Sequence, residues 1–199
     1  MKQKSARIKK IMAVFCCMVM AMAIAGCQRT DKSSPKGLTE VYLEKMKEGK
    51  YKEACDTVGA EFDQKSYDKS ASLQKELMKL TYANMTYEVN EEKIKDDKAT
   101  VSVKVKNFNY IDTMNDAIYE TMKQKKDDEF TKSEFTKKMK KAKQKEETVL
   151  VNYRKENKKW IFDGSNSLLN AAMLGYLIKL FRNDINFCIF ILFLYMFHS

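Results

Sequence analysis

Residues 85–106 read MTYEVNEEKIKDDKATVSVKVK, and this stretch decides the fold class. Apolar and polar residues alternate from Met85 to Asn90 and again from Ala99 to Lys106. A period of two is typical of a strand with one buried face. The pair Asp96-Asp97 between the two runs favours a turn. We therefore predict an antiparallel hairpin whose valine side faces a core and whose lysine side faces water.

A second hairpin is predicted further along the chain. Residues 148–154 alternate in the same way, with Val149, Val151 and Tyr153 on one face. A turn at 156–158 follows, and it leads into a short apolar run that begins at Trp160. Two hairpins predict an antiparallel sheet of about four strands.

Helical spacing of apolar residues accounts for most of the remaining chain. The expected helices span 38–47, 51–58 and 72–83, and two further pieces lie within 111–145, separated by a charged break at 125–129. In the first of these two pieces, the apolar residues at helical spacing are Ile111, Met114, Ile118 and Met122. The expected fold class is α+β, with N-terminal helices packed on a curved antiparallel sheet of about four strands and a helical insertion between two hairpins.

Three segments resemble bacterial lipoprotein domains of the nuclear transport factor 2-like (cystatin-like) fold, many of which have no known function. They are the joint Gly49-Lys50-Tyr51, the hairpin end at 103–107 and the final run at 158–163. The resemblance covers about residues 38–175. It implies a cone-like domain formed by helices and a concave sheet, and it carries no activity.

The N-terminus predicts where the protein resides. Residues 2–10 are basic, residues 11–24 are almost wholly apolar, and Ile24-Ala25-Gly26-Cys27 follows. This pattern resembles the signal of bacterial lipoproteins, which implies cleavage before Cys27 and lipid attachment to its thiol. The alternatives are a secretory signal that ends at a cysteine by chance, or an uncleaved anchor.

The lipoprotein reading divides the chain and places it. Residues 1–26 are the expected signal peptide, 27–37 a lipidated tether, 38–175 the folded domain, and 176–199 an apolar tail of uncertain status. We expect the protein on the outer face of the bacterial cytoplasmic membrane, held there by acyl chains at Cys27.

The amino-acid composition argues against some classes of binding partner and some types of catalysis. The formal net charge is +10, and the five basic residues of 1–26 leave about +5 for the mature chain. Mature arginines are few, and Arg is the residue that reads bases and phosphates bidentately, so we expect no nucleic acid partner. The single histidine, His198, leaves little scope for zinc or Ser-His-Asp chemistry. We expect no catalysis, no cofactor and no metal.

The resemblance also suggests where a small ligand would sit. Side chains that would line the cone are Tyr42, Met46, Tyr82, Phe108 and Trp160. Aromatic side chains more often fill such a space than line it. Enzymes of this fold place an Asp or His inside the cone, and no position here marks one. We therefore expect a non-catalytic domain that binds a small ligand or a protein partner; the alternatives are an enzyme that uses the cone, or a purely structural envelope protein.

A lysine-rich helix is the sharpest basic feature. Lys137, Lys138, Lys140 and Lys141 lie in it, next to the predicted core positions Phe135, Met139 and Ala142. One interpretation is contact with anionic lipid headgroups or an acidic wall polymer. The other is a solvated face around an apolar stripe.

The last part of the chain is unusually apolar. From Ile185 to Phe197 only Asn186 is polar. Thirteen residues are too few for an ordinary membrane span, which needs about 20. The segment extends the last helix, dips into the membrane, or is an aberrant tail.

Overall fold

The computed structural model describes residues 31–176, and its centre is an antiparallel sheet in the order β1-β2-β3-β4. The strands are β1 (Thr86–Lys95), β2 (Lys98–Asn107), β3 (Lys145–Glu156) and β4 (Lys159–Phe162). In register, Val103 of β2 lies between Val89 of β1 and Val149 of β3. Both predicted hairpins are confirmed, and their apolar phase is the buried face.

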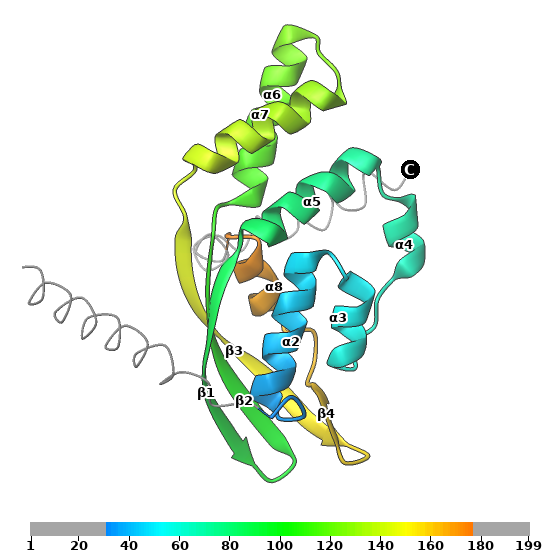
Figure 1. Ribbon diagram of the computed structural model, residues 1–199, viewed down its shortest axis with the longest axis vertical. Helices are drawn as coiled ribbons and strands as arrows, with labels where there is room; N and C mark the ends of the chain where they lie inside the picture. Colours follow the sequence, from blue (N-terminus) through cyan, green and yellow to red (C-terminus); the bar gives the residue numbers. More distant parts are fainter. Residues whose placement is uncertain (1–30, 177–199) are drawn as a thin grey trace, which may run out of the picture. The chain divides into compact units, whose positions relative to one another are not determined.

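Seven helices accompany the sheet in the described residues, and Figure 1 shows their arrangement. They are α2 (Pro35–Glu48), α3 (Tyr51–Thr57), α4 (Gln64–Lys69), α5 (Ser72–Asn84), α6 (Tyr110–Gln124), α7 (Asp128–Lys141) and α8 (Ser167–Met173). Helix α2 packs on β1 and β2, and α8 packs on β2 and β3. The α+β class is therefore confirmed, with α6 and α7 inserted between the two hairpins.

The first helix starts earlier than the sequence predicted. Residues up to Gly37 were expected to form a tether, yet α2 begins at Pro35. The hydroxyl of Ser34 accepts a hydrogen bond of 3.1 Å from the Gly37 amide, which caps the helix. Proline is favoured at the first helical position because its φ is preset and its missing N–H is not needed there. The boundary at residue 37 was therefore wrong, because Pro35 starts a helix.

Helix α4 was missed. None of its residues is buried, so it carries no apolar periodicity that a sequence pattern could detect. Its local signal is polar: Asp63 accepts a hydrogen bond of 2.9 Å from the Ser66 amide.

The described residues contain two hydrophobic clusters. The first lies between the sheet, α2, α3 and α8, and its sheet side includes the fully buried Val101, Val103 and Val105. The second lies between α5, α6 and α7 and consists of Leu77, Phe108, Tyr110, Ala117 and Phe135. The Phe135 ring packs edge-on against those of Phe108 and Tyr110, with centroids 5.8 and 6.0 Å apart. This second cluster fixes the position of α7, which is the lysine-rich helix.

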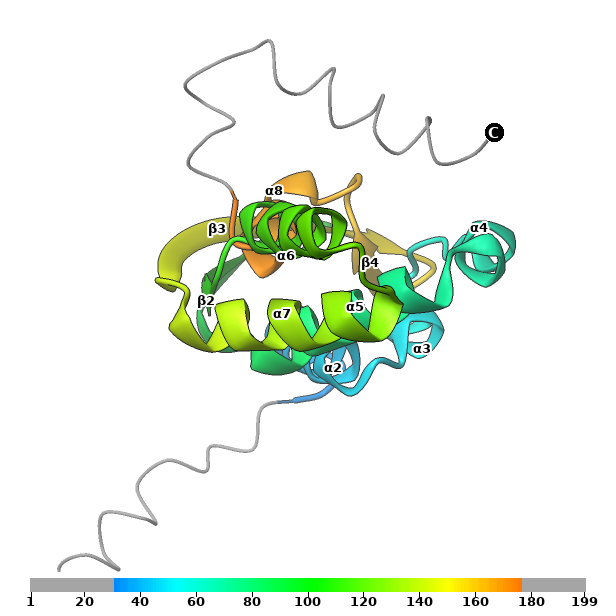
Figure 2. The same cartoon turned by 90° about the horizontal axis from the view of Figure 1, so that it is seen from above.

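The buried face of α6 differs from its apolar stripe. The residues that become buried are Tyr110, Thr113, Ala117 and Thr121. Small residues let α6 and α7 lie side by side (Figure 2), and the hydroxyls of Thr121 and Thr131 meet at 2.9 Å across the pair. Ile118 and Met122 from the apolar set are exposed as a result.

Candidate functional site

The lysine-rich helix α7 is held in place by its ends and by one buried face. The Asp127 carboxylate accepts a hydrogen bond of 3.1 Å from the Phe130 amide and caps the helix start. Asp128 and Glu129 in the first turn and lysines in the last turn both suit the helix dipole. Thr131 and Phe135 face inward. Met139 packs against the same cluster, and most of the charged side chains lie on the remaining circumference.

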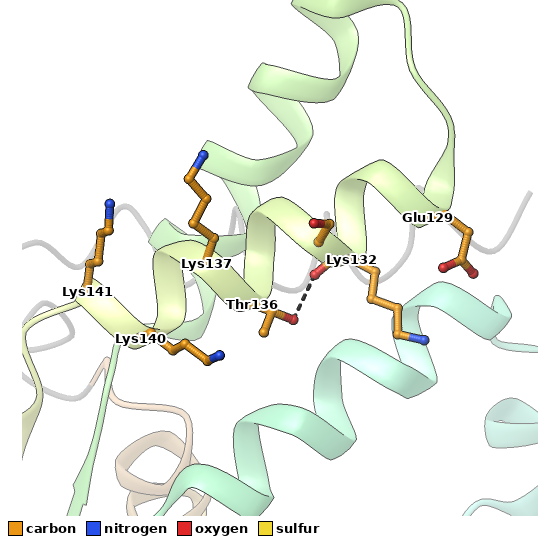
Figure 3. Close-up of a pocket in the computed structure, with 7 residues that line it drawn as sticks. Glu129, Lys132, Thr136, Lys137, Lys140 and Lys141 are labelled. Carbon is orange, nitrogen blue, oxygen red and sulfur yellow. Dashed lines mark hydrogen bonds between the residues drawn. The ribbon is translucent and has the colours of Figure 1, made fainter.

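A shallow hollow of about 530 Å³ runs along α7. Its lining residues are Glu129, Lys132, Ser133, Thr136, Lys137, Lys140 and Lys141 (Figure 3). Three of the four lysines predicted from the sequence therefore share one surface. The fourth, Lys138, is half-buried and is not part of the lining.

The lysines of the hollow differ in their partners. Lys132 pairs with Glu76 of α5 at 2.6 Å, and the hydrogen bond and charge of Glu76 raise the pKa of Lys132. Lys137 pairs with Glu134 at 3.1 Å. Within residues 31–176, no carboxylate lies within 4.0 Å of the Lys140 or Lys141 ammonium groups.

Spacing on the helix brings like charges together. Lys137 lies three residues before Lys140 and four before Lys141, which makes them neighbours on the helix surface. Like-charged neighbours at this spacing repel each other in a free helix. Residues 137–145 contain six lysines and no acid. An anion bound along this surface would remove the repulsion.

The residues predicted to line a cone pocket lie mainly in the cores. Tyr42, Met46 and Tyr82 belong to the first cluster and Phe108 to the second, so they do not surround one common space. The Tyr42 ring packs edge-on against Phe162 with centroids 5.2 Å apart, and its hydroxyl donates to Asn170 Oδ1 at 3.5 Å.

Trp160 lies at the margin of the first cluster and is half-buried. Its outer face is covered by the ammonium group of Lys155, 5.1 Å from the ring centroid. In the described residues these aromatic side chains take part in core packing and do not surround one common space.

Sequence reasoning missed Glu147. It alternates in phase with Val149, Val151 and Tyr153, and in register it lies opposite Val105, so it is on the inner face of the sheet. One of its carboxylate oxygens, Oε1, is buried and has no hydrogen-bond partner. The period of two that predicted the strand was sufficient to place this residue inward.

Among residues 31–176, no three His, Cys, Asp or Glu side chains gather closely enough to hold a metal ion. Burial raises the pKa of the Cys55 thiol, which disfavours the nucleophilic thiolate.

The predicted signal peptide of residues 1–26, the lipidation site Cys27 and the apolar segment 185–197 lie outside the described residues. Between residues 31 and 176, no helix combines the length and the apolar character needed to cross a membrane. The chain matches no protein-family model, no curated protein and no solved structure. The resemblance to nuclear transport factor 2-like lipoproteins stays a prediction.

Proposed function

We propose that this protein is a lipid-anchored, extracytoplasmic binding protein that holds a phosphate-rich anionic surface against α7 without catalysis. The observation that carries the proposal is the pair Lys140 and Lys141, which line the hollow without a carboxylate partner in the described residues. The anchor at Cys27 rests on the lipobox alone.

Helix stability accounts for only part of the lysine pattern. A lysine in the last turn interacts favourably with the helix dipole, which explains the presence of one or two. The run continues beyond Lys141 to Lys143 and Lys145, where the helix has ended. These additional positive charges support a contact with an external anion.

The use of lysine indicates the kind of anion. Lysine is a flexible, strongly hydrated point charge, whereas arginine supplies the rigid fork that reads phosphates and bases bidentately. A row of lysines on a shallow surface suits a repeating array of negative charges. Phospholipid headgroups and phosphodiester polymers of the cell wall both offer such an array, and a lipid anchor would keep the domain near both.

The proposed absence of catalysis is supported by the packing of the aromatic side chains. Tyr42, Met46 and Tyr82 lie in the first hydrophobic cluster, where they pack against other core side chains. An enzyme that uses the cone is the second candidate, and Glu147 is the observation that favours it.

The proposal is tested with lipid-free protein, residues 28–199. Binding is measured to phosphatidylglycerol vesicles, to neutral phosphatidylcholine vesicles and to a soluble phosphodiester polymer. A variant with Lys137, Lys138, Lys140 and Lys141 changed to Gln is compared with a charge-matched control in which Lys65, Lys69, Lys95 and Lys98 are changed to Gln. All four control lysines are exposed and lie outside the hollow.

We expect the α7 variant to bind anionic ligand at least about tenfold more weakly than the control, because lysines near an anionic surface each contribute to attraction. Added salt should weaken binding of the unmodified protein. Equal affinities of the two variants would overturn the proposal. The anchor is tested separately: fatty-acid label that persists in Cys27→Ala contradicts lipidation at this residue.

A further inference from the structure

The hollow along α7 has a base of short side chains and sides of long ones. Ser133 and Thr136 both line it, and their spacing of three residues makes them neighbours on the helix surface. Figure 3 shows the Lys140 side chain extending toward α5, whereas Lys137 and Lys141 extend to the other side of α7. The hollow therefore has hydroxyl groups at its base and ammonium groups on both sides.

The two hydroxyl groups at the base are available to a ligand. Ser133 is exposed. The Thr136 hydroxyl donates a hydrogen bond of 2.9 Å to the Lys132 carbonyl, and its oxygen keeps lone pairs that can accept a further hydrogen bond. A ligand that carries hydroxyl groups between its phosphates would match both kinds of group in the hollow.

The length of the hollow suits a linear ligand. The lining residues run from Glu129 to Lys141, which is about 18 Å along the helix axis. The charge is uneven along this length, because the carboxylate of Glu129 lies at one end and the lysines without a described carboxylate partner, Lys140 and Lys141, lie at the other. The phosphates of a bound strand would concentrate at the lysine end.

A lipid bilayer fits this surface less well. Helices that bind to bilayers place an apolar face into the headgroup boundary. The apolar side chains Phe135 and Met139 of α7 pack instead against the second cluster, and no apolar residue lines the hollow in the described part of the chain. A flat bilayer would therefore meet the ammonium groups at the sides, and the hydroxyl groups at the base would stay out of its reach.

We propose that the partner of α7 is a single strand of a hydroxyl-bearing phosphodiester polymer that lies lengthwise in the hollow. Its phosphates contact Lys137, Lys140 and Lys141, and its hydroxyl groups contact Ser133 and Thr136. The inference rests on the proposed function and narrows it, since both phospholipid headgroups and such polymers present arrays of phosphate. Contact with a bilayer is then electrostatic and confined to the lysines.

The test fills the base of the hollow and leaves the lysines in place. Ser133→Trp is introduced into the lipid-free protein, residues 28–199, and circular dichroism checks that it is folded. Ser133 is exposed, so the helix can carry the larger side chain. The control is Asn115→Trp, because Asn115 is exposed on α6 and does not line the hollow. Binding is measured to synthetic poly(glycerol phosphate) and to phosphatidylglycerol vesicles.

We expect Ser133→Trp to bind poly(glycerol phosphate) at least about tenfold more weakly than Asn115→Trp, because the indole occupies space that the strand needs. The two variants should bind the vesicles equally. Equal polymer affinities of the two variants, or an equal loss of polymer and vesicle binding in Ser133→Trp, would overturn the inference. Vesicle binding without polymer binding in the unmodified protein would overturn it too.

The variant with four α7 lysines changed to Gln separates this inference from the proposed function. If Ser133→Trp leaves polymer binding unchanged and the lysine variant still weakens binding, α7 binds anions but does not seat a strand in its hollow. If the lysine variant binds polymer and vesicles as the unmodified protein does, the proposed function itself fails.

Discussion

The side-chain amide of Asn107 donates a hydrogen bond of 2.7 Å to the carbonyl oxygen of Met173. The same amide nitrogen donates to the Thr81 carbonyl at 3.0 Å, and the Asn107 oxygen accepts from the Phe108 amide at 3.0 Å. Asn107 is fully buried at the end of β2. One side chain thus ties together the sheet, α5 and α8, and it sets the direction in which the chain enters α6.

Asn107→Leu should destabilise the protein by about 3 kcal/mol or more, because it strands several buried backbone groups that each cost about 1–3 kcal/mol when unpaired. The matched change is Asn84→Ala, which removes only the 3.2 Å contact between the two side-chain amides. Urea unfolding monitored by circular dichroism measures both. Similar losses from the two variants would show that Asn107 is not the central contact.

Gly175 offers a clean comparison with Gly164. The φ angle is +70° at Gly175 and +77° at Gly164, and both values disfavour a side chain. A carbon added at Gly175 would collide with the Phe108 carbonyl. A carbon added at Gly164, however, meets nothing within 4 Å. Gly175→Ala should therefore lose clearly more stability and lower the melting temperature more than Gly164→Ala. Equal melting temperatures would contradict the close approach of residue 175 to Phe108.

The hairpins could be predicted because their period of two is unbroken over Ala99–Lys106 and 148–154. Helix α4 and the start of α2 could not, because their signals are polar caps at Asp63 and Ser34 that apolar periodicity does not register. Apolar periodicity indicates the type of a secondary-structure element, but it does not indicate the surface against which that element packs.

Helix α6 and the lysines of α7 illustrate what periodicity leaves undetermined. The apolar stripe of α6 predicted a helix but not its inner face, since the threonine pair Thr121 and Thr131 and the Phe135 ring decide how α6 and α7 meet. The lysines of α7 were identified from sequence density alone. Their shared hollow, and the separation of Lys138 from it, depend on the orientation that the second cluster imposes.

Glu147→Leu should stabilise the protein by about 1 kcal/mol or more, because it removes a buried carboxylate oxygen that has no partner. Binding to anionic vesicles should be unchanged. Glu147→Gln serves as the polar isostere and should give a smaller gain. Loss of stability in Glu147→Leu would show that the carboxylate has a role that the described contacts do not reveal.

Alkaline pH should destabilise the fold through its buried tyrosines. Burial raises the pKa of Tyr51 and Tyr110 from 10.0 to about 12. Above pH 10 the unfolded chain loses these protons first, so it binds fewer protons than the folded chain, and stability falls as pH rises towards about 12. Urea unfolding at pH 8 and pH 11 measures the loss, and Tyr110→Phe should reduce it. An identical loss in that variant would assign the effect to other groups.

The most direct measurement of the central claim is lysine footprinting. Lipid-free protein is treated with an amine-reactive reagent, with and without phosphatidylglycerol vesicles, and the modification of each lysine is quantified by mass spectrometry. We predict strong protection of Lys140 and Lys141, which line the hollow without a carboxylate partner in the described residues, and little change at the exposed Lys65 and Lys95. Uniform protection of all four, or protection of Lys65 and Lys95 alone, would contradict binding through α7.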